Sequence, residues 1–215
     1  MRPRPRLLEA NQRVGLWSGP RFARLRIGLL GGSFNPPHPG HVHVSRQAAL
    51  ALGLDMVWWL VSPGNPLKDP DSYIPFEERL DLAKQIAAPK GLVVTDIEAQ
   101  LKSRLTVETL THLIRRMPRV EFVWLMGADN LESFQTWHKW SRIFHSCPIA
   151  VVGRPTYSLR ALNSQAAIRF KSSRRKSSAL RARRQRLKAP IWTFVSCRLH
   201  DASSSKIRRE AGISL

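Results

Sequence analysis

Cysteines, long apolar runs and acidic residues are all scarce in this sequence. The chain has two cysteines, Cys147 and Cys197, and neither has a CxxC partner or metal-ligand spacing. We therefore expect buried free thiols rather than a disulfide framework or a metal site. No apolar stretch approaches the length of a transmembrane helix, and the N-terminus lacks the apolar core of a secretory signal. These absences predict a cytoplasmic protein with no membrane partner.

The shortage of acidic residues gives the chain a formal net charge of +20, from 35 Lys and Arg against 15 Asp and Glu. Such an excess would ordinarily suggest a nucleic-acid-binding protein, and that class is one hypothesis for this chain. The excess is concentrated in residues 1–26 and 154–190, whereas residues 27–153 hold twelve basic and twelve acidic residues. Because the basic segments also lack interleaved aromatic residues for base stacking, we favour an interpretation without nucleic acid as a partner.

The length and the composition are typical of one globular domain. A chain of 215 residues with 43% hydrophobic residues is long enough to bury a sizeable core. We expect a basic, flexible N-terminal arm at 1–25 and one domain at 26–215, in which 154–190 is a basic helical segment. The alternatives for residues 1–25 are a targeting peptide and the product of an upstream start codon.

The stretch 26–45 changes its period and its chemistry within a few residues. Ile27–Leu30 is a short apolar run typical of a buried parallel strand, and it ends at two glycines that permit a tight turn. Three prolines then prevent a helix until Gly40. A strand, a rigid turn and a helix N-terminus predict a phosphate site, because free N–H groups and the helix dipole attract anions. His38 and His41 would flank the bound phosphate.

The stretch from Gly32 to His41 runs Gly-Ser-Phe-Asn-Pro-Pro-His-Pro-Gly-His. It resembles the Gly-x-Phe-Asp-Pro-x-His-x-Gly-His signature of the nucleotidyltransferases related to class I aminoacyl-tRNA synthetases. Asn35 stands where most members have Asp, which keeps a turn-forming side chain but removes a charge. The alternative is a proline-rich loop with two incidental histidines. Agreement at six motif positions between a strand and a helix favours the resemblance.

Further apolar runs alternate with amphipathic stretches along the rest of the chain. The alternation predicts an α/β fold, and the resemblance implies a doubly wound, Rossmann-like parallel sheet of the nucleotidyltransferase (HUP) type in a single domain. We expect two amphipathic helices in the basic segment, with a serine-rich break between them. The other predicted strands are 55–61, 91–97, 120–126, 148–152 and 190–195, and the other predicted helices are 75–87 and 106–114.

Polar residues follow several predicted strands at their carboxyl ends, where open α/β sheets bind ligands. Lys68 is either such a ligand or a solvated loop lysine. Asp129 is either a helix N-cap or a ligand of a ribose hydroxyl. Thr106 is expected to cap the next helix, with Thr109 three residues later. Trp137 either packs in the core or lines a pocket.

A second candidate site lies near the C-terminus, in the stretch from Asp201 to Arg208. Three serines precede an amphipathic start, and Lys206 and Arg208 add positive charge. An ordinary capped terminal helix is the alternative. The stretch resembles the Ile-Ser-Ser-Thr-x-Ile-Arg motif of the same superfamily, with Ala202 and Ser205 in place of Ile and Thr.

Both motifs and the contexts of the strand-end residues are similar to those of the bacterial nicotinate-mononucleotide adenylyltransferases, over roughly residues 27–210. The resemblance implies transfer of AMP from ATP to nicotinate mononucleotide, which gives deamido-NAD and pyrophosphate in NAD biosynthesis. It implies Mg²⁺ bound with ATP. The alternative within enzymes is a sibling transferase with another acceptor, such as phosphopantetheine or nicotinamide mononucleotide, or a cytidylyltransferase. Trp137 and the segment from Thr106 to Thr109 argue against these siblings.

The resemblance also assigns roles to individual residues, and His38 and His41 are the expected catalytic residues. The expected ATP-binding residues are Gly31, Gly32, Ser33, Phe34, His38, Gly40, His41, Ser203, Ser204, Ser205, Lys206 and Arg208. The expected acceptor-binding residues are Asn35, Lys68, Thr106, Thr109, Asp129 and Trp137. No metal ligand from the protein is expected.

Overall fold

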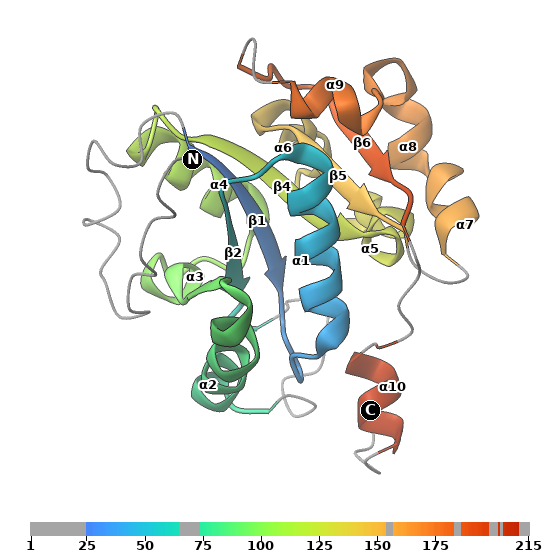
Figure 1. Cartoon of the computed structure of the whole chain (residues 1–215). Helices are drawn as coiled ribbons and strands as arrows, with labels where there is room; N and C mark the ends of the chain where they lie inside the picture. The colour runs from blue at the N-terminus through green and yellow to red at the C-terminus, as the bar shows by residue number, and fades with distance from the viewer. Residues whose placement is uncertain are drawn as a thin grey trace.

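A six-stranded, fully parallel sheet forms the centre of the molecule, with the strand order β3-β2-β1-β4-β5-β6 (Figure 1). The computed structural model describes residues 25–64, 74–153, 157–182, 186–197, 202 and 204–210, with only the backbone of residues 205, 206 and 210. The first strand lies in the middle, and the order reverses between β1 and β4. The predicted α/β doubly wound fold is confirmed.

The strands are short apolar runs, as expected for a parallel sheet that is covered on both faces. All the predicted strands exist, and their bounds differ from the predicted ones by a few residues. They are β1 (Arg26–Gly32), β2 (Met56–Val61), β3 (Val93–Thr95), β4 (Glu121–Gly127), β5 (Ile149–Val152) and β6 (Trp192–Val195).

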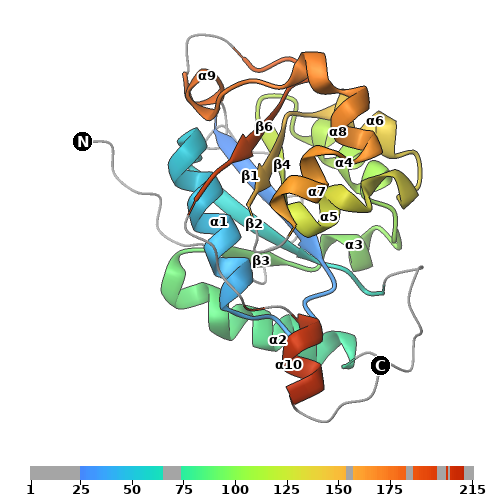
Figure 2. The same cartoon turned by 90° about the vertical axis from the view of Figure 1, so that its right-hand side faces the viewer.

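Helices cover both faces of the sheet (Figures 1 and 2). One face is covered by α1 (Pro39–Leu52), α2 (Phe76–Ala87) and α9 (Ser177–Arg181). The other is covered by α4 (Thr106–Arg116), α6 (Trp140–Ser146) and the neighbouring short helices. These short helices are α3 (Ile97–Gln100), α5 (Ala128–Glu132), α7 (Ser158–Leu162) and α8 (Gln165–Arg169); α10 (Ser204–Glu210) lies apart from them.

The two cores follow from the two-residue period of the strands. Trp58 points into the core beneath α4, whereas its neighbour Trp59 points into the core beneath α1. Both indoles are at most 2% exposed. Full burial of a large apolar side chain contributes roughly 1.5–3 kcal/mol, so both faces stabilise the sheet.

Three local predictions were wrong in detail. Helix α1 begins at Pro39 rather than at Gly40, because the missing N–H of proline is tolerated in a first helical turn. The third strand ends at Thr95, whose Oγ1 accepts a hydrogen bond from the N–H of Ile97 and starts the short helix α3. In the basic segment, the described residues form α7, α8 and α9, each of five residues, instead of two longer helices.

A buried arginine at the start of the first strand ties distant elements together. The guanidinium Nε of Arg26 donates to Glu121 at 2.7 Å, across to β4. Its Nη1 donates to the carbonyls of Leu52 at 3.3 Å and Leu180 at 2.5 Å. Strand β1, the end of α1 and the basic segment therefore meet at one cation.

The cysteines follow the prediction in part. Cys147 is a buried free thiol, and burial raises its pKa to about 12. Cys197 is also free but only half-buried, and its Sγ lies 3.5 Å from Nε2 of His43. Among the described helices, none combines the length and the apolar character that a membrane span requires.

Candidate active site

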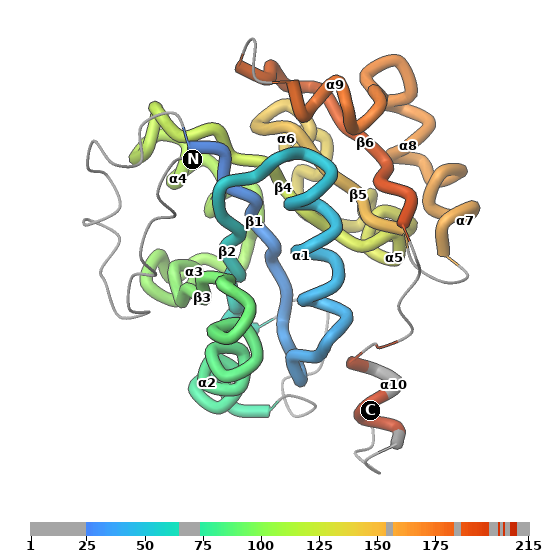
Figure 3. Tube along the Cα trace, in the orientation of Figure 1, coloured from blue at the N-terminus to red at the C-terminus, as the bar shows by residue number. Residues whose placement is uncertain are grey.

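The loops at the carboxyl ends of the central strands carry the candidate site. Strand β1 ends at Gly32, and the chain turns through Asn35 and Pro36 into α1. Figure 3 shows that the C-terminal helix α10 returns to the same end of the sheet, close to the start of α1. The two sequence motifs are 160 residues apart in the chain and adjacent in space.

His38 and His41 together cap the N-terminus of α1. Nδ1 of His38 accepts a hydrogen bond from the N–H of Gly40 at 3.1 Å, and Nδ1 of His41 accepts one from the N–H of His38 at 3.1 Å. A neutral imidazole whose Nδ1 accepts carries its proton on Nε2. The turn therefore fixes both rings in the tautomer that can donate from Nε2.

The rings of the two histidines lie against each other and on a buried aromatic layer. Their centroids are 3.9 Å apart. Phe34 lies 4.5 Å from His41 and stacks on Trp59 at 4.9 Å. Since Phe34 is 1% exposed, its ring supports His41 from below instead of offering a surface to ATP.

Glycine is required at two positions of this site, because neighbouring atoms lie too close to the backbone for a side chain. A Cβ on Gly31 would lie 2.3 Å from the indole of Trp124. A Cβ on Gly40 would lie 2.7 Å from the carbonyl oxygen of Ala202, a residue of the second motif. No side chain fits at either position without displacing its neighbours, so both glycines keep the backbone tight around the turn.

Two hydrogen bonds between described residues connect helix α10 to the turn. The hydroxyl of Ser204 donates to the carbonyl of Pro36 at 2.9 Å. Nη1 of the buried Arg208 donates to the carbonyl of Asn35. The second of these bonds brings the guanidinium of Arg208 to the loop that leads into His38.

Asn35 also connects the turn to the segment just before α2. Its Oδ1 accepts a hydrogen bond from the N–H of Ile74 at 3.0 Å, and the side chain is 3% exposed. An amide oxygen makes this bond without burying a carboxylate, which would cost several kcal/mol if left unpaired. The geometry assigns Asn35 to loop organisation rather than to direct contact with an acceptor.

Arg79 is a site-forming residue that the sequence analysis missed. It lies on α2 and is 1% exposed. Its guanidinium donates to the carbonyls of Ser33 at 2.5 Å, Ser62 at 2.8 Å and Pro63 at 3.1 Å. One cation thus holds the loops after β1 and β2 together. The sequence around Arg79 does not predict this role. Its hydrogen-bond acceptors are backbone carbonyls, which every residue has, so no partner residue type marks the contact.

A buried carboxyl group occupies the space between β2 and α4. Glu98 is 4% exposed, and the Thr109 hydroxyl lies within 3.4 Å of its Oε1. Burial raises the pKa of Glu98 to about 7, although hydrogen bonds from Ser62 and Thr109 oppose the shift. The predicted acceptor residue Thr109 is therefore directed inward, toward Glu98 and the carbonyl of Leu105.

Thr106 is the first residue of α4 and not its N-cap, a position that Leu105 occupies. Ser103 stabilises this helix start, because its hydroxyl accepts from the N–H of Leu105 at 3.2 Å and donates to Glu108 at 2.6 Å. Thr106 itself is half-buried at the carboxyl edge of the sheet. It stays available for an acceptor contact.

Asp129 and Trp137 lie at the carboxyl end of β4. Asp129 is the second residue of α5, whose N-cap is Gly127, so the N-cap interpretation of Asp129 was wrong. Trp137 is half-buried and packs on Phe134 at 4.9 Å and edge-on to Trp124 at 6.4 Å. The indole is therefore held by two aromatic neighbours while part of the side chain stays accessible.

Four predicted site side chains lie outside the part of the chain that the structure describes. Lys68 and Ser203 lie outside the described residues, and so do the side chains of Ser205 and Lys206. Their roles remain predictions.

The fold and the joined motifs define the class of this protein as an α/β nucleotidyltransferase. A family model described as cytidylyltransferase-like matches residues 29–210. A probable nicotinate-nucleotide adenylyltransferase of Cereibacter sphaeroides is 50% identical over 182 residues, which cover 85% of this chain and 95% of that protein. One of Ruegeria pomeroyi is 46% identical over 188 residues, 87% of each chain.

The solved structure of the Plasmodium falciparum nicotinic acid mononucleotide adenylyltransferase complexed with NaAD has the same fold. It matches with a TM-score of 0.64 at 16% identity, over 86% of this chain and 83% of that one. The chain belongs to the cytidylyltransferase-like family and, within it, to the nicotinate-nucleotide adenylyltransferases.

Proposed function

We propose that this protein transfers AMP from ATP to nicotinate mononucleotide, forming deamido-NAD and releasing pyrophosphate. The observation that carries the proposal is the docking of α10 on the turn that precedes His38. It gathers two imidazole donors, a helix N-terminus and a guanidinium at one end of the sheet, which is an arrangement suited to a triphosphate. The relatives named above support the choice of acceptor.

In this mechanism the chain acts by positioning and by stabilising charge. The acceptor phosphate is ionised at neutral pH, so it attacks the α-phosphorus in line without a general base. Nε2–H of His38 and of His41 donate to phosphate oxygens, and the bonds strengthen as negative charge gathers on pyrophosphate. The bond between the α-phosphorus and the oxygen that bridges to the β-phosphate breaks. Pyrophosphate leaves and carries the negative charge of that oxygen.

Mg²⁺ enters with ATP in this proposal and offsets charge on the phosphates when bound. The described residues contain no group of three or more His, Cys, Asp or Glu side chains placed to hold a metal ion. The described side chains at the turn can donate hydrogen bonds to the phosphates of ATP. They would thereby hold the nucleotide that brings Mg²⁺, and the ion would supply positive charge to the phosphates. Ser204 and Arg208 then hold the loop that receives the phosphates.

We place the acceptor beside Thr106, Asp129 and Trp137. The indole supplies a flat surface for the pyridine ring, and Asp129 can accept from a ribose hydroxyl. The free N–H groups at the start of α4 can donate to the nicotinate carboxylate. A neutral amide would bring an N–H₂ against those donors, a mismatch that we expect to cost about 3–5 kcal/mol.

A pyrophosphate-release assay with ATP and a set of acceptors tests the proposal. We expect turnover with nicotinate mononucleotide, roughly 10²–10⁴-fold lower efficiency with nicotinamide mononucleotide, and none with phosphopantetheine. Equal efficiency with the acid and the amide would mean that the acceptor pocket is wrongly assigned. Turnover with phosphopantetheine alone would establish the sibling transferase instead.

A further inference from the structure

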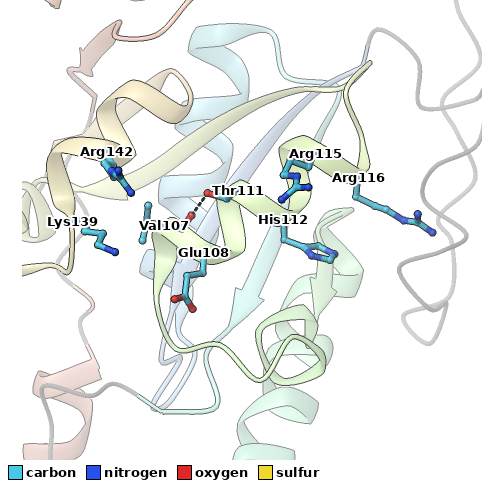
Figure 4. A pocket seen from close by; sticks show the side chains of 8 residues that line it. All are labelled: Val107, Glu108, Thr111, His112, Arg115, Arg116, Lys139 and Arg142. Carbon is cyan, nitrogen blue, oxygen red and sulfur yellow. Dashed lines mark hydrogen bonds between the residues drawn. The ribbon is translucent and has the colours of Figure 1, made fainter.

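An open groove of about 590 Å³ lies between α4 and α6, outside the site described so far (Figure 4). Its floor contains Val107 and Thr111, whose hydroxyl donates to the carbonyl of Val107 at 2.7 Å. The groove is lined by Val107, Glu108, Thr111, His112, Arg115, Arg116, Lys139 and Arg142.

The lining is strongly positive. Arg115, Arg116, Lys139 and Arg142 are exposed cations, against the single carboxylate of Glu108, which accepts a hydrogen bond from Ser103. None of the four cations forms an ion pair or a side-chain hydrogen bond with any residue that the structure describes. Their charges are therefore directed at the groove and the solvent.

The helix dipole explains the positions of two of these four cations but not those of the other two. Arg115 and Arg116 lie in the last turn of α4, where cations stabilise the helix dipole. Arg142 lies in the first turn of α6, where the dipole disfavours a cation. Lys139 has φ 49° and ψ 37°, a left-handed conformation that gives lysine no advantage over glycine or asparagine. Lys139 and Arg142 thus point to an anionic ligand.

The groove begins at the two segments that carry the candidate acceptor residues. Val107 follows Thr106 directly, and Lys139 comes two residues after Trp137. From that end the groove follows α4, whose eleven residues span roughly 16 Å. Lys139 is the N-cap of α6 and Arg142 lies in its first turn, whereas Arg115 and Arg116 lie at the far end of α4.

We propose that this groove attracts and retains the anionic acceptor on its way to the acceptor site, and that it contributes to the preference for the acid over the amide. The inference rests on the function proposed above. Nicotinate mononucleotide carries one more negative charge than nicotinamide mononucleotide, so a positive potential raises its local concentration more. The effect operates within a screening length of roughly 8–10 Å, and salt weakens it.

The test is the double variant Lys139→Gln/Arg142→Gln, with Arg115→Gln/Arg116→Gln as the distal pair and Lys90→Gln as the control. Lys90 is an exposed lysine in the turn after α2, far from the groove in sequence and without a described partner. For each protein, kcat/KM for nicotinate mononucleotide, for the amide and for ATP is measured from about 0.02 to about 0.3 M salt. Thermal unfolding checks that each variant is folded.

We expect the proximal pair to lower kcat/KM for the acid by about 3–10-fold at low salt, with kcat at saturation unchanged. The loss should be about 2-fold for the amide and absent for ATP, the salt dependence should become shallower, and the distal pair should have a smaller effect. An unchanged efficiency and salt dependence in the proximal pair would overturn the inference, and so would an equal loss for ATP. If the unmodified enzyme does not turn over nicotinate mononucleotide, the proposed function itself fails.

Discussion

At the scale of single residues, His38 and His41 each have one ring nitrogen engaged by the backbone of the turn. In the tautomer that these bonds fix, the other nitrogen, Nε2, carries the proton and is a donor. His38→Asn and His41→Gln retain an oxygen that can accept at the N-cap and N3 positions but lose the Nε2 donor. We expect turnover to fall by about 10²-fold or more, as it does when a transition-state donor is removed, with a thermal midpoint close to that of the unmodified protein.

His38→Ala and His41→Ala should show the same loss of turnover. Each should also lose about 1 kcal/mol of stability, since alanine removes the side-chain acceptor at the N-terminus of α1. A trapped covalent nucleotidyl-histidine would contradict a purely electrostatic role for the two rings.

Glu98 gives the protein a stability that depends on pH. Its pKa in the folded protein, about 7, lies above the 4.5 of a glutamate side chain in water. Its stabilising contribution is therefore fully present below pH 4.5 and is lost as the pH rises through 7. Glu98→Gln cannot ionise, so at pH 8 it should be more stable than the unmodified protein by about 2–3 kcal/mol, with little difference near pH 4 to 5. Urea unfolding at the two pH values measures this. A constant difference would show that Glu98 does not titrate with folding.

Trp137 should act on the acceptor and not on ATP. Removing the indole in Trp137→Ala takes away the flat surface that we assign to the pyridine ring. We expect a higher Michaelis constant for nicotinate mononucleotide and a nearly unchanged one for ATP, measured by pyrophosphate release. An intact acceptor affinity in this variant would place the ring elsewhere.

The residues with a recognisable spacing could be predicted from the sequence, whereas their partners could not. The spacing of His38, Gly40 and His41 pointed to a phosphate turn, and the structure shows a helix N-terminus there. Nothing in the sequence indicates that Arg79 donates to the carbonyls of the loops after β1 and β2, or that Thr109 faces a buried Glu98. These contacts depend on where the chain folds in three dimensions, and the residue types alone are compatible with an exposed helix surface.

At the scale of elements, α10 is attached to the turn rather than to the sheet. No residue of α10 belongs to the two core clusters among the described residues, and its described contacts include those of Ser204 and Arg208 to the loop. Arg208→Gln should therefore lower turnover by about 10–10²-fold and leave the unfolding transition of the sheet almost unchanged.

The adjacent Arg209 is exposed and provides a matched control. Arg209→Gln removes the same charge from the same helix and should turn over normally. Equal losses in the two variants would show that net charge, and not the docking contact, matters.

The order of strands and helices could be predicted because buried parallel strands are continuous apolar runs. The bounds of the short elements could not. Thr95 ends β3 by a side-chain hydrogen bond, and the apolar residues of the basic segment are too sparse to fix where each short helix stops. In both cases tertiary contacts decide between conformations of similar local energy.

At the scale of the whole molecule, the first strand begins where the predicted N-terminal arm ends. Strand β1 begins at Arg26, and the carbonyl of Leu25 accepts from the N–H of Glu121 at 2.8 Å. A chain that starts at Leu25 should fold with an unchanged thermal midpoint and full turnover. Loss of folded protein or of activity would show that the arm packs on the domain.

The bonds of Arg26 also affect how the protein is made. A ribosome releases the central strand β1 first, yet the acceptors of its guanidinium at Glu121 and Leu180 are translated much later. An emerging chain that folded early would enclose a cation before its carboxylate and carbonyl partners existed, at a cost of several kcal/mol. Because β4 is also the second neighbour of β1, the nascent polypeptide cannot pair both sides of its first strand before β4 has been synthesised, and the guanidinium of Arg26 lacks one of its carbonyl acceptors until Leu180 follows.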